Sequence, residues 1–92
     1  MNAQMRTRNI MIASRRTTIR LEAAVWHALD EICENQNISR HDLCTRIDGA
    51  RGAANRAQAV RAMVINYFRL VAQRPKAAED VITKALRGLE TA

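Results

Sequence analysis

Aromatic residues and cysteines are both scarce in this chain of 92 residues, and each scarcity limits the structure that the chain can form. With only 3% aromatic residues, a core built on large aromatic side chains is excluded, and a thin helical core that depends on a partner is expected. The two cysteines, Cys33 and Cys44, lie beside apolar positions, and neither has a companion at metal-ligand spacing. We expect both to be small buried side chains in a reducing cytoplasm, with a disulfide between them left open.

Long apolar runs and catalytic groupings are also missing. No segment is apolar enough to span a membrane or to form the core of a signal peptide, so a cytoplasmic protein is expected. No nucleophile, base and orienting group share a motif, and His27 and His41 fall in different expected helices. His27 lies near Asp30 and Glu31, but a solvated helix face is favoured over a metal site. We therefore expect no enzyme activity, no cofactor and no metal.

Acidic residues are absent from the first 21 positions, which carry five arginines. Residues 22–37 reverse this pattern with four acids and no lysine or arginine, and residues 38–74 are basic again. The whole chain has a net charge of +6 and a pI near 10.7. A strongly basic segment of this kind indicates a polyanionic ligand such as nucleic acid.

Residues 14–22 alternate in the period expected of a β-strand, because successive side chains of a strand point to opposite faces. The two faces differ in character, with Thr17, Ile19 and Leu21 on one and Arg16, Thr18 and Arg20 on the other. The rest of the chain after Leu21 has helical spacing, and no second convincing strand is present. A lone strand leaves its backbone groups unpaired. We therefore expect a mostly α protein with one β-strand, paired antiparallel with the same strand of a second copy.

Such a ribbon fits the major groove of double-stranded DNA, where arginine bonds guanine and threonine bonds polar base edges or packs on the thymine methyl. The alternative is an edge strand that exposed charge protects from aggregation. Residues 1–13 form either a floppy terminus or a basic arm whose Ile10, Met11 and Ile12 lengthen the ribbon. As an arm, they place Arg6 and Arg8 along the phosphate backbone, and Arg15 at the start of the strand is also expected to bind phosphate.

Two helices are expected after the strand. Glu22 to Gln36 carries an apolar stripe anchored by Trp26, and Asn37 ends this helix because asparagine tolerates the left-handed conformation. Ser39 then caps a second helix, with Asp42 completing a capping box. Unpaired amides at this helix start, flanked by Arg40 and His41, favour a phosphate beside the ribbon. The alternative is that Asp42 serves only as a cap.

The C-terminal half is expected to add two more helices. After a glycine-bearing connector over residues 48–54, Asn55 caps a long helix with Gln58 at the capping-box position. Arg74 ends that helix because Pro75 follows it. A last amphipathic helix runs from Lys76 to Leu89, and its balanced charge suits packing or a protein partner better than DNA. The chain thus divides into a basic arm (1–13), a central domain (14–74) and a C-terminal helix (75–92).

The order strand, helix, turn, helix, with Arg-x-Thr-x-Arg on the strand, resembles the ribbon-helix-helix superfamily of Arc- and MetJ-type repressors. A bacterial subfamily is more similar still, through these features: Arg16-Thr17-Thr18-Ile19-Arg20-Leu21-Glu22, Trp26, Ile47-Asp48…Arg51-Gly52 and Tyr67-Phe68-Arg69. The resemblance covers about residues 14–70. Two departures are Asn37 in place of the usual glycine and the longer chain after Gly52.

The resemblance implies a homodimer whose ribbon enters the major groove. By position, the base-reading residues are Arg16, Thr18 and Arg20, and the phosphate-binding residues at the second helix are Ser39, Arg40 and His41. The expected function is therefore a sequence-specific DNA-binding repressor or autoregulator. An alternative is an antitoxin or accessory protein whose C-terminal helices bind a protein partner, and the same helices could join dimers on tandem sites.

Overall fold

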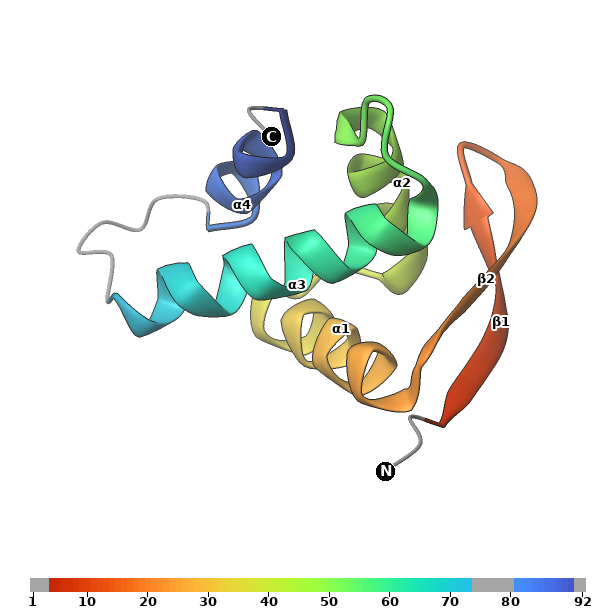
Figure 1. Ribbon diagram of the computed structural model, residues 1–92, viewed down its shortest axis with the longest axis horizontal. Helices are drawn as coiled ribbons and strands as arrows, with labels where there is room; N and C mark the ends of the chain where they lie inside the picture. Colours follow the sequence, from red (N-terminus) through yellow and green to blue (C-terminus); the bar gives the residue numbers. More distant parts are fainter. Residues whose placement is uncertain (1–3, 74–80, 91–92) are drawn as a thin grey trace.

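The computed structural model describes residues 4–73 and 81–90, which form a hairpin and four helices (Figure 1). In chain order the elements are β1 (Met5–Ile12), β2 (Arg15–Glu22), α1 (Ala23–Gln36), α2 (Arg40–Ala50), α3 (Arg56–Ala72) and α4 (Val81–Glu90). The expected last helix from Lys76 to Leu89 is therefore seen from Val81 onward, because residues 74–80 lie outside the described part.

The prediction of a single strand is wrong: β2 pairs antiparallel with β1 of the same chain. The two strands are joined by Ala13 and Ser14, whose φ angles are 49° and 68°. A two-residue loop with both φ angles positive is the type I′ turn that suits a hairpin, and asparagine and glycine are its usual residues. Alanine and serine give no such signal, so the turn was not visible in the sequence. Residues 5–12, assigned to the basic arm, form β1.

The predicted alternation of β2 is present in the structure. Ile19 and Leu21 are buried and Thr17 is half-buried, whereas the residues between them are exposed. From β1, Ile10 and Ile12 are buried beside them, because the register pairs Ile10 with Thr17 and thus aligns the inner faces of both strands. The hairpin therefore has one face against the helices and one face in solvent.

The helix ends follow the predicted capping residues. Asn37 adopts the left-handed conformation (φ 53°), and the N–H of Ile38 donates to the carbonyl of Cys33, as in a Schellman-type end. At α3 both bonds of the predicted capping box between Asn55 and Gln58 are formed. At α2 the Ser39 hydroxyl accepts from the backbone N–H of Asp42 at 3.0 Å, which is the Ser39 half of the box predicted there.

The core lies between the hairpin and the four helices, with α3 in contact with α1, α2 and α4 (Figure 1). Its largest fully buried side chains include Trp26, Leu29, Ile32, Leu43, Met63 and Tyr67. The C-terminal helix joins this core through Ile82, Ala85 and Leu86. None of the helices in the described part of the chain has the length and apolar character needed to cross a membrane.

Candidate nucleic-acid interface

The solvent face of the hairpin carries the three residues that the sequence singled out as base readers. Arg16, Thr18 and Arg20 are all exposed on β2. The register sets each opposite a residue of β1, in the pairs Met11 with Arg16, Asn9 with Thr18, and Thr7 with Arg20. These β1 residues are exposed too, so the polar face is two strands wide within one chain.

No residue in the described part of the chain neutralises the charges on this face. The guanidinium groups of Arg16 and Arg20 have no hydrogen-bond or ion-pair partner among the described residues, and the same holds for the guanidinium of Arg15 at the start of β2. Four arginines of the helices and their connections do pair with carboxylates: Arg40 with Asp30, Arg51 and Arg56 with Asp48, and Arg61 with Glu22. The hairpin face therefore presents cationic groups that an external anion can bind.

Among the residues that the structure describes, the side-chain hydrogen bond found on this face joins the two strands. The Thr18 hydroxyl donates to the Oδ1 of Asn9 at 2.9 Å. This bond holds the Asn9 carboxamide and leaves its amino group directed elsewhere. Among the described residues that amino group has no partner, so it remains a free hydrogen-bond donor.

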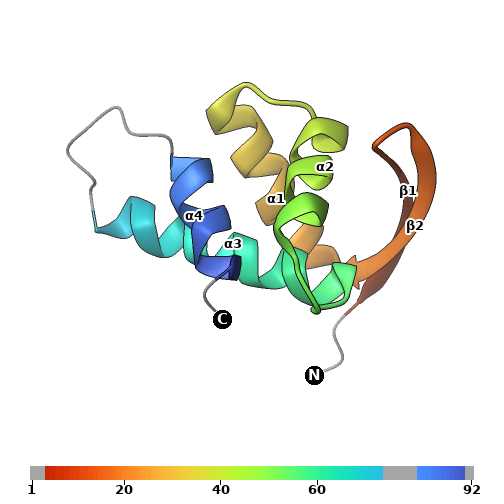
Figure 2. The same ribbon diagram turned by 90° about the horizontal axis from the view of Figure 1, so that it is seen from above.

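The two edges of the hairpin differ. On β1, the N–H of Met11 donates to the Nδ1 of His41 at 2.9 Å, and the N–H of Ala13 donates to the Thr45 hydroxyl at 3.2 Å. Two side chains of α2 therefore occupy the β1 edge, and Figure 2 shows α2 beside β1 with β2 on the far side.

The backbone pairing then shows which groups lie on the β2 edge. Because the N–H of Met11 points toward α2, Met11 and Arg16 form a pair without ladder hydrogen bonds. Such pairs alternate along an antiparallel ladder. The backbone groups of Arg16, Thr18 and Arg20 therefore point away from β1, and no other hydrogen bond of the described residues uses them. The β2 edge is open.

Arg6 and Arg8 do not lie with the candidate base readers. The register places them opposite Leu21 and Ile19, on the face that turns toward the helices. The carbonyl of Arg6 accepts a hydrogen bond from the Trp26 indole at 3.0 Å, and the Arg8 guanidinium lies 5.4 Å from the centre of the indole ring. Arg8 thus stabilises the junction of hairpin and helices through a cation–π contact.

The start of α2 lies beside β1, but its side chains are engaged. Arg40 makes a bidentate ion pair with Asp30, with distances of 2.7 and 2.9 Å from Nη2, and its guanidinium lies 5.6 Å from the Trp26 ring centre. Ser39 caps the helix. His41 accepts the Met11 N–H through Nδ1, so a neutral imidazole carries its proton on Nε2, where it can donate to an anion.

One ion pair anchors the end of β2. The Nε of Arg61 donates to a carboxylate oxygen of Glu22 at 2.9 Å. This hydrogen bond, with the backbone bond of Glu22, lowers the pKa of the Glu22 carboxyl below its ordinary value of 4.5. The pair joins α3 to the junction between β2 and α1.

The two thiols are free, and neither lies in a reactive setting. Burial raises the pKa of Cys44 to about 12 and also raises the pKa of the half-buried Cys33. Within the described residues no group of three or more His, Cys, Asp or Glu side chains is placed to hold a metal ion. Cys44 packs as a small apolar side chain, as the sequence predicted.

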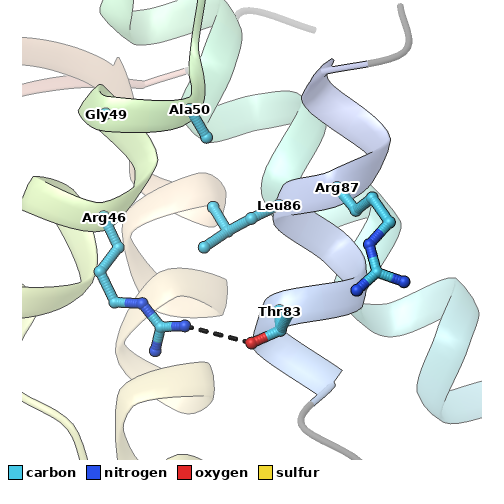
Figure 3. Close-up of a pocket in the computed structure, with 6 residues that line it drawn as sticks. All are labelled: Arg46, Gly49, Ala50, Thr83, Leu86 and Arg87. Atoms are coloured by element: carbon cyan, nitrogen blue, oxygen red, sulfur yellow. Dashed lines mark hydrogen bonds between the residues drawn. The ribbon is translucent and has the colours of Figure 1, made fainter.

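A hollow of about 500 Å³ lies between α2 and α4, away from the hairpin. Figure 3 shows Arg46 of α2 reaching across it, where its Nη2 donates to the Thr83 hydroxyl at 3.3 Å. Leu86 points into the space between the helices. Arg87 of α4 also lines the hollow. The hollow therefore lies at the contact between α2 and α4.

The residues that sequence reasoning missed are those of β1, above all Thr7 and Asn9. Within residues 5–12, isoleucines stand at alternate positions 10 and 12, which is only a weak signal for a strand with one buried face. Without a recognisable turn at Ala13 and Ser14, that signal did not identify a second strand.

A family model described as a ribbon-helix-helix domain matches residues 5–68. The match begins at the first residue of β1 and ends within α3, so both strands belong to the family's domain, whereas the resemblance seen in the sequence began only at residue 14. Comparison with curated proteins and with solved structures gives no match. Because the matched segment covers well over half of the chain, this protein belongs to the ribbon-helix-helix domain family.

Proposed function

We propose that this protein is a sequence-specific DNA-binding homodimer that acts as a transcriptional repressor or autoregulator. Ribbon-helix-helix domains typically bind DNA and dimerise. The observation that carries the proposal for this chain is the pair of unneutralised arginines, Arg16 and Arg20, that flank Thr18 on an exposed strand with an open edge. Arginine bonds the O6 and N7 acceptors of guanine, and threonine suits polar base edges or the thymine methyl.

The open β2 edge supports pairing with β2 of a second copy. Side chains of α2 already occupy the β1 edge, so β2 is the edge that a second strand can join. An antiparallel pairing of two identical strands is self-complementary and closes with two-fold symmetry. The resulting sheet has the order β1, β2, partner β2, partner β1, and it satisfies the outward backbone groups of Arg16, Thr18 and Arg20.

In this sheet the two central strands carry the base-reading residues of both subunits. A two-stranded ribbon is narrow enough for the major groove. The start of α2 then supplies phosphate contacts through its free amides and the Nε2 of His41. Arg40 contributes mainly to stability in this arrangement, because Asp30 binds the Nε and Nη2 atoms of its guanidinium.

Proline substitutions test the dimer with a matched control. Thr18→Pro removes an N–H that faces the open edge and is not used by the β1–β2 ladder, so it should dissociate the dimer without unpairing the hairpin. Thr7→Pro removes the equivalent outward N–H from β1 and should leave the dimer intact. Analytical ultracentrifugation measures the oligomeric state of both variants. A Thr18→Pro protein that remains dimeric would exclude pairing through β2.

Selection from a random DNA pool at fixed salt tests the base-reading role. The wild-type protein should enrich a short palindrome or repeat. Arg20→Ala should lose about 1–3 kcal/mol of binding free energy at the base pair that Arg20 reads, and the preference for that base pair should relax. Arg69→Ala removes the same charge from an exposed position on α3 and should keep the preference. Equal enrichment by the wild-type and Arg20→Ala proteins would refute the assignment of β2 as the reader.

The alternative of an antitoxin or accessory protein depended on a C-terminal helix free to bind a partner. In the structure the apolar face of α4 packs within the chain, with Ile82, Ala85 and Leu86 buried. A partner would therefore have to use another surface of α4. The described residues favour DNA binding over this alternative.

A further inference from the structure

We propose that Asn9 of β1 binds the DNA phosphate backbone at the edge of the major groove, as a contact additional to those of β2. The inference rests on the proposed function, because it requires two hairpins joined through their β2 edges on DNA. It adds a residue from outside the central ribbon, and it assigns to that residue a phosphate oxygen as its ligand.

The first step is the width of the sheet. Neighbouring strands lie about 4.8 Å apart, so the two outer strands of the four-stranded sheet are separated by about 14 Å. The major groove of B-form DNA is about 12 Å wide. The two β2 strands therefore fit between the groove walls, whereas each β1 strand lies over a wall, which is formed by phosphates. Side chains on the outer face of β1 meet the backbone and not the base edges.

The second step is the chemistry of the residues that β1 presents there. The central residue of its outer face is Asn9, which is exposed and stands opposite Thr18. Its Oδ1 accepts the Thr18 hydroxyl at 2.9 Å, which fixes the carboxamide and leaves the Nδ2 donors unused among the described residues. A free N–H donor complements a phosphate oxygen, and side-chain amides are common phosphate contacts.

The third step is the position of α2. His41 contacts β1 at Met11, two residues from Asn9 and on the edge away from β2. The helix start and the outer face of β1 are therefore next to each other on the same flank of the sheet. A phosphate strand that passes this flank meets Asn9 and the α2 amides in succession.

Substitutions at Asn9 test the contact on the sequence that the wild-type protein selects. Asn9→Asp keeps an oxygen for the Thr18 hydroxyl but replaces the donor with a negative charge, so it should weaken binding strongly. Asn9→Ala removes two contacts per dimer and should weaken binding about tenfold. Asn35→Asp makes the same charge change at an exposed site at the end of α1 and serves as the control. Dissociation constants are measured on the selected site and on its single-base variants, after circular dichroism has established that each variant is folded.

If Asn9 binds phosphate, Asn9→Ala should raise the dissociation constant by the same factor on every single-base variant, because the DNA backbone is identical in all of them. Wild-type affinity in both Asn9 variants would overturn the inference, and so would a loss confined to one base pair, which would indicate base contact. Either result would overturn only the Asn9 contact, and the proposed function would stand as long as Arg20→Ala still loses its base preference. If Arg20→Ala binds like the wild type, the proposed function itself fails.

Discussion

At the scale of single residues, the arginines divide into two groups according to whether a carboxylate neutralises them. Those on the helices that pair with acids hold the elements together, whereas Arg15, Arg16 and Arg20 on β2 have no such partner among the described residues. An ion pair at a partly exposed site adds little stability, so the internal pairs mainly fix geometry. These β2 arginines are the ones that we propose bind DNA.

The Glu22–Arg61 pair predicts a pH-dependent difference in stability. Because the folded-state pKa of Glu22 is lowered, the pair contributes stability above the unfolded pKa of 4.5 and loses it as the pH falls through the folded pKa. Arg61→Gln should therefore be less stable than the wild type at neutral pH, and the difference should vanish in acid. Urea unfolding at several pH values measures it. Arg69→Gln, exposed on the same helix, is the control and should show no such convergence.

At the scale of elements, the hairpin and the helix connections depend on residues in left-handed conformations. Ala13, Ser14 and Asn37 adopt positive φ without being glycine, and Gly52 does so after α2 with φ 58°. Such angles cost free energy for residues with a Cβ, so each must be held by the packing around it. The turn at Ala13 and Ser14 is held by the inner face of the hairpin and by the Thr45 hydrogen bond.

Two glycines separated by a short distance in the chain allow a matched test of this cost. A Cβ at Gly49 or at Gly52 would meet nothing within 4 Å, so packing does not distinguish the two. Gly52→Ala should destabilise the fold by about 1 kcal/mol because of its positive φ. Gly49→Ala, within α2, should instead stabilise it by up to about 1 kcal/mol. Chemical denaturation gives both values, and equal effects would contradict the conformational explanation.

The helix boundaries were readable because caps are local. Asn37, Ser39 and Asn55 each end or start a helix through hydrogen bonds to residues within a few positions, and the structure forms these caps. The second strand was missed for a related reason: its turn lacks the local chemistry of a type I′ loop. What stabilises that turn comes from α2, which is distant in the sequence.

At the scale of the whole molecule, α4 lies beyond the family match of residues 5–68 and yet completes the core. Its close approach to α3 is marked by Gly88, where a Cβ would lie 2.7 Å from the Asn66 amide nitrogen. The same amide donates to the Ala85 carbonyl at 3.2 Å. We therefore expect α4 to unfold together with the rest of the domain.

Shortening a buried side chain of α4 tests this cooperativity. Ile82 is 2% exposed, so Ile82→Ala should lower the free energy of unfolding by about 2–4 kcal/mol. Val81→Ala, at a half-buried neighbour, should cost distinctly less. Thermal or urea unfolding monitored by Trp26 fluorescence reports on the core far from α4 in sequence. An unchanged midpoint in Ile82→Ala would mean that α4 is not part of the cooperative unit.

The sequence by itself determined the features that depend on near neighbours. These are the two-faced pattern of β2, the capping residues, the helical stripes and the absence of acids before Glu22, and they were enough to indicate the ribbon-helix-helix family. Only the tertiary structure decided which groups remain available. In it β2 pairs with β1, and Arg8 and Arg40 lie against Trp26. His41 binds the β1 edge, and Asn9 stays exposed beside Thr18. The physical reason is that ion pairs, cation–π contacts and strand edges join residues far apart in the chain, and no local pattern specifies them.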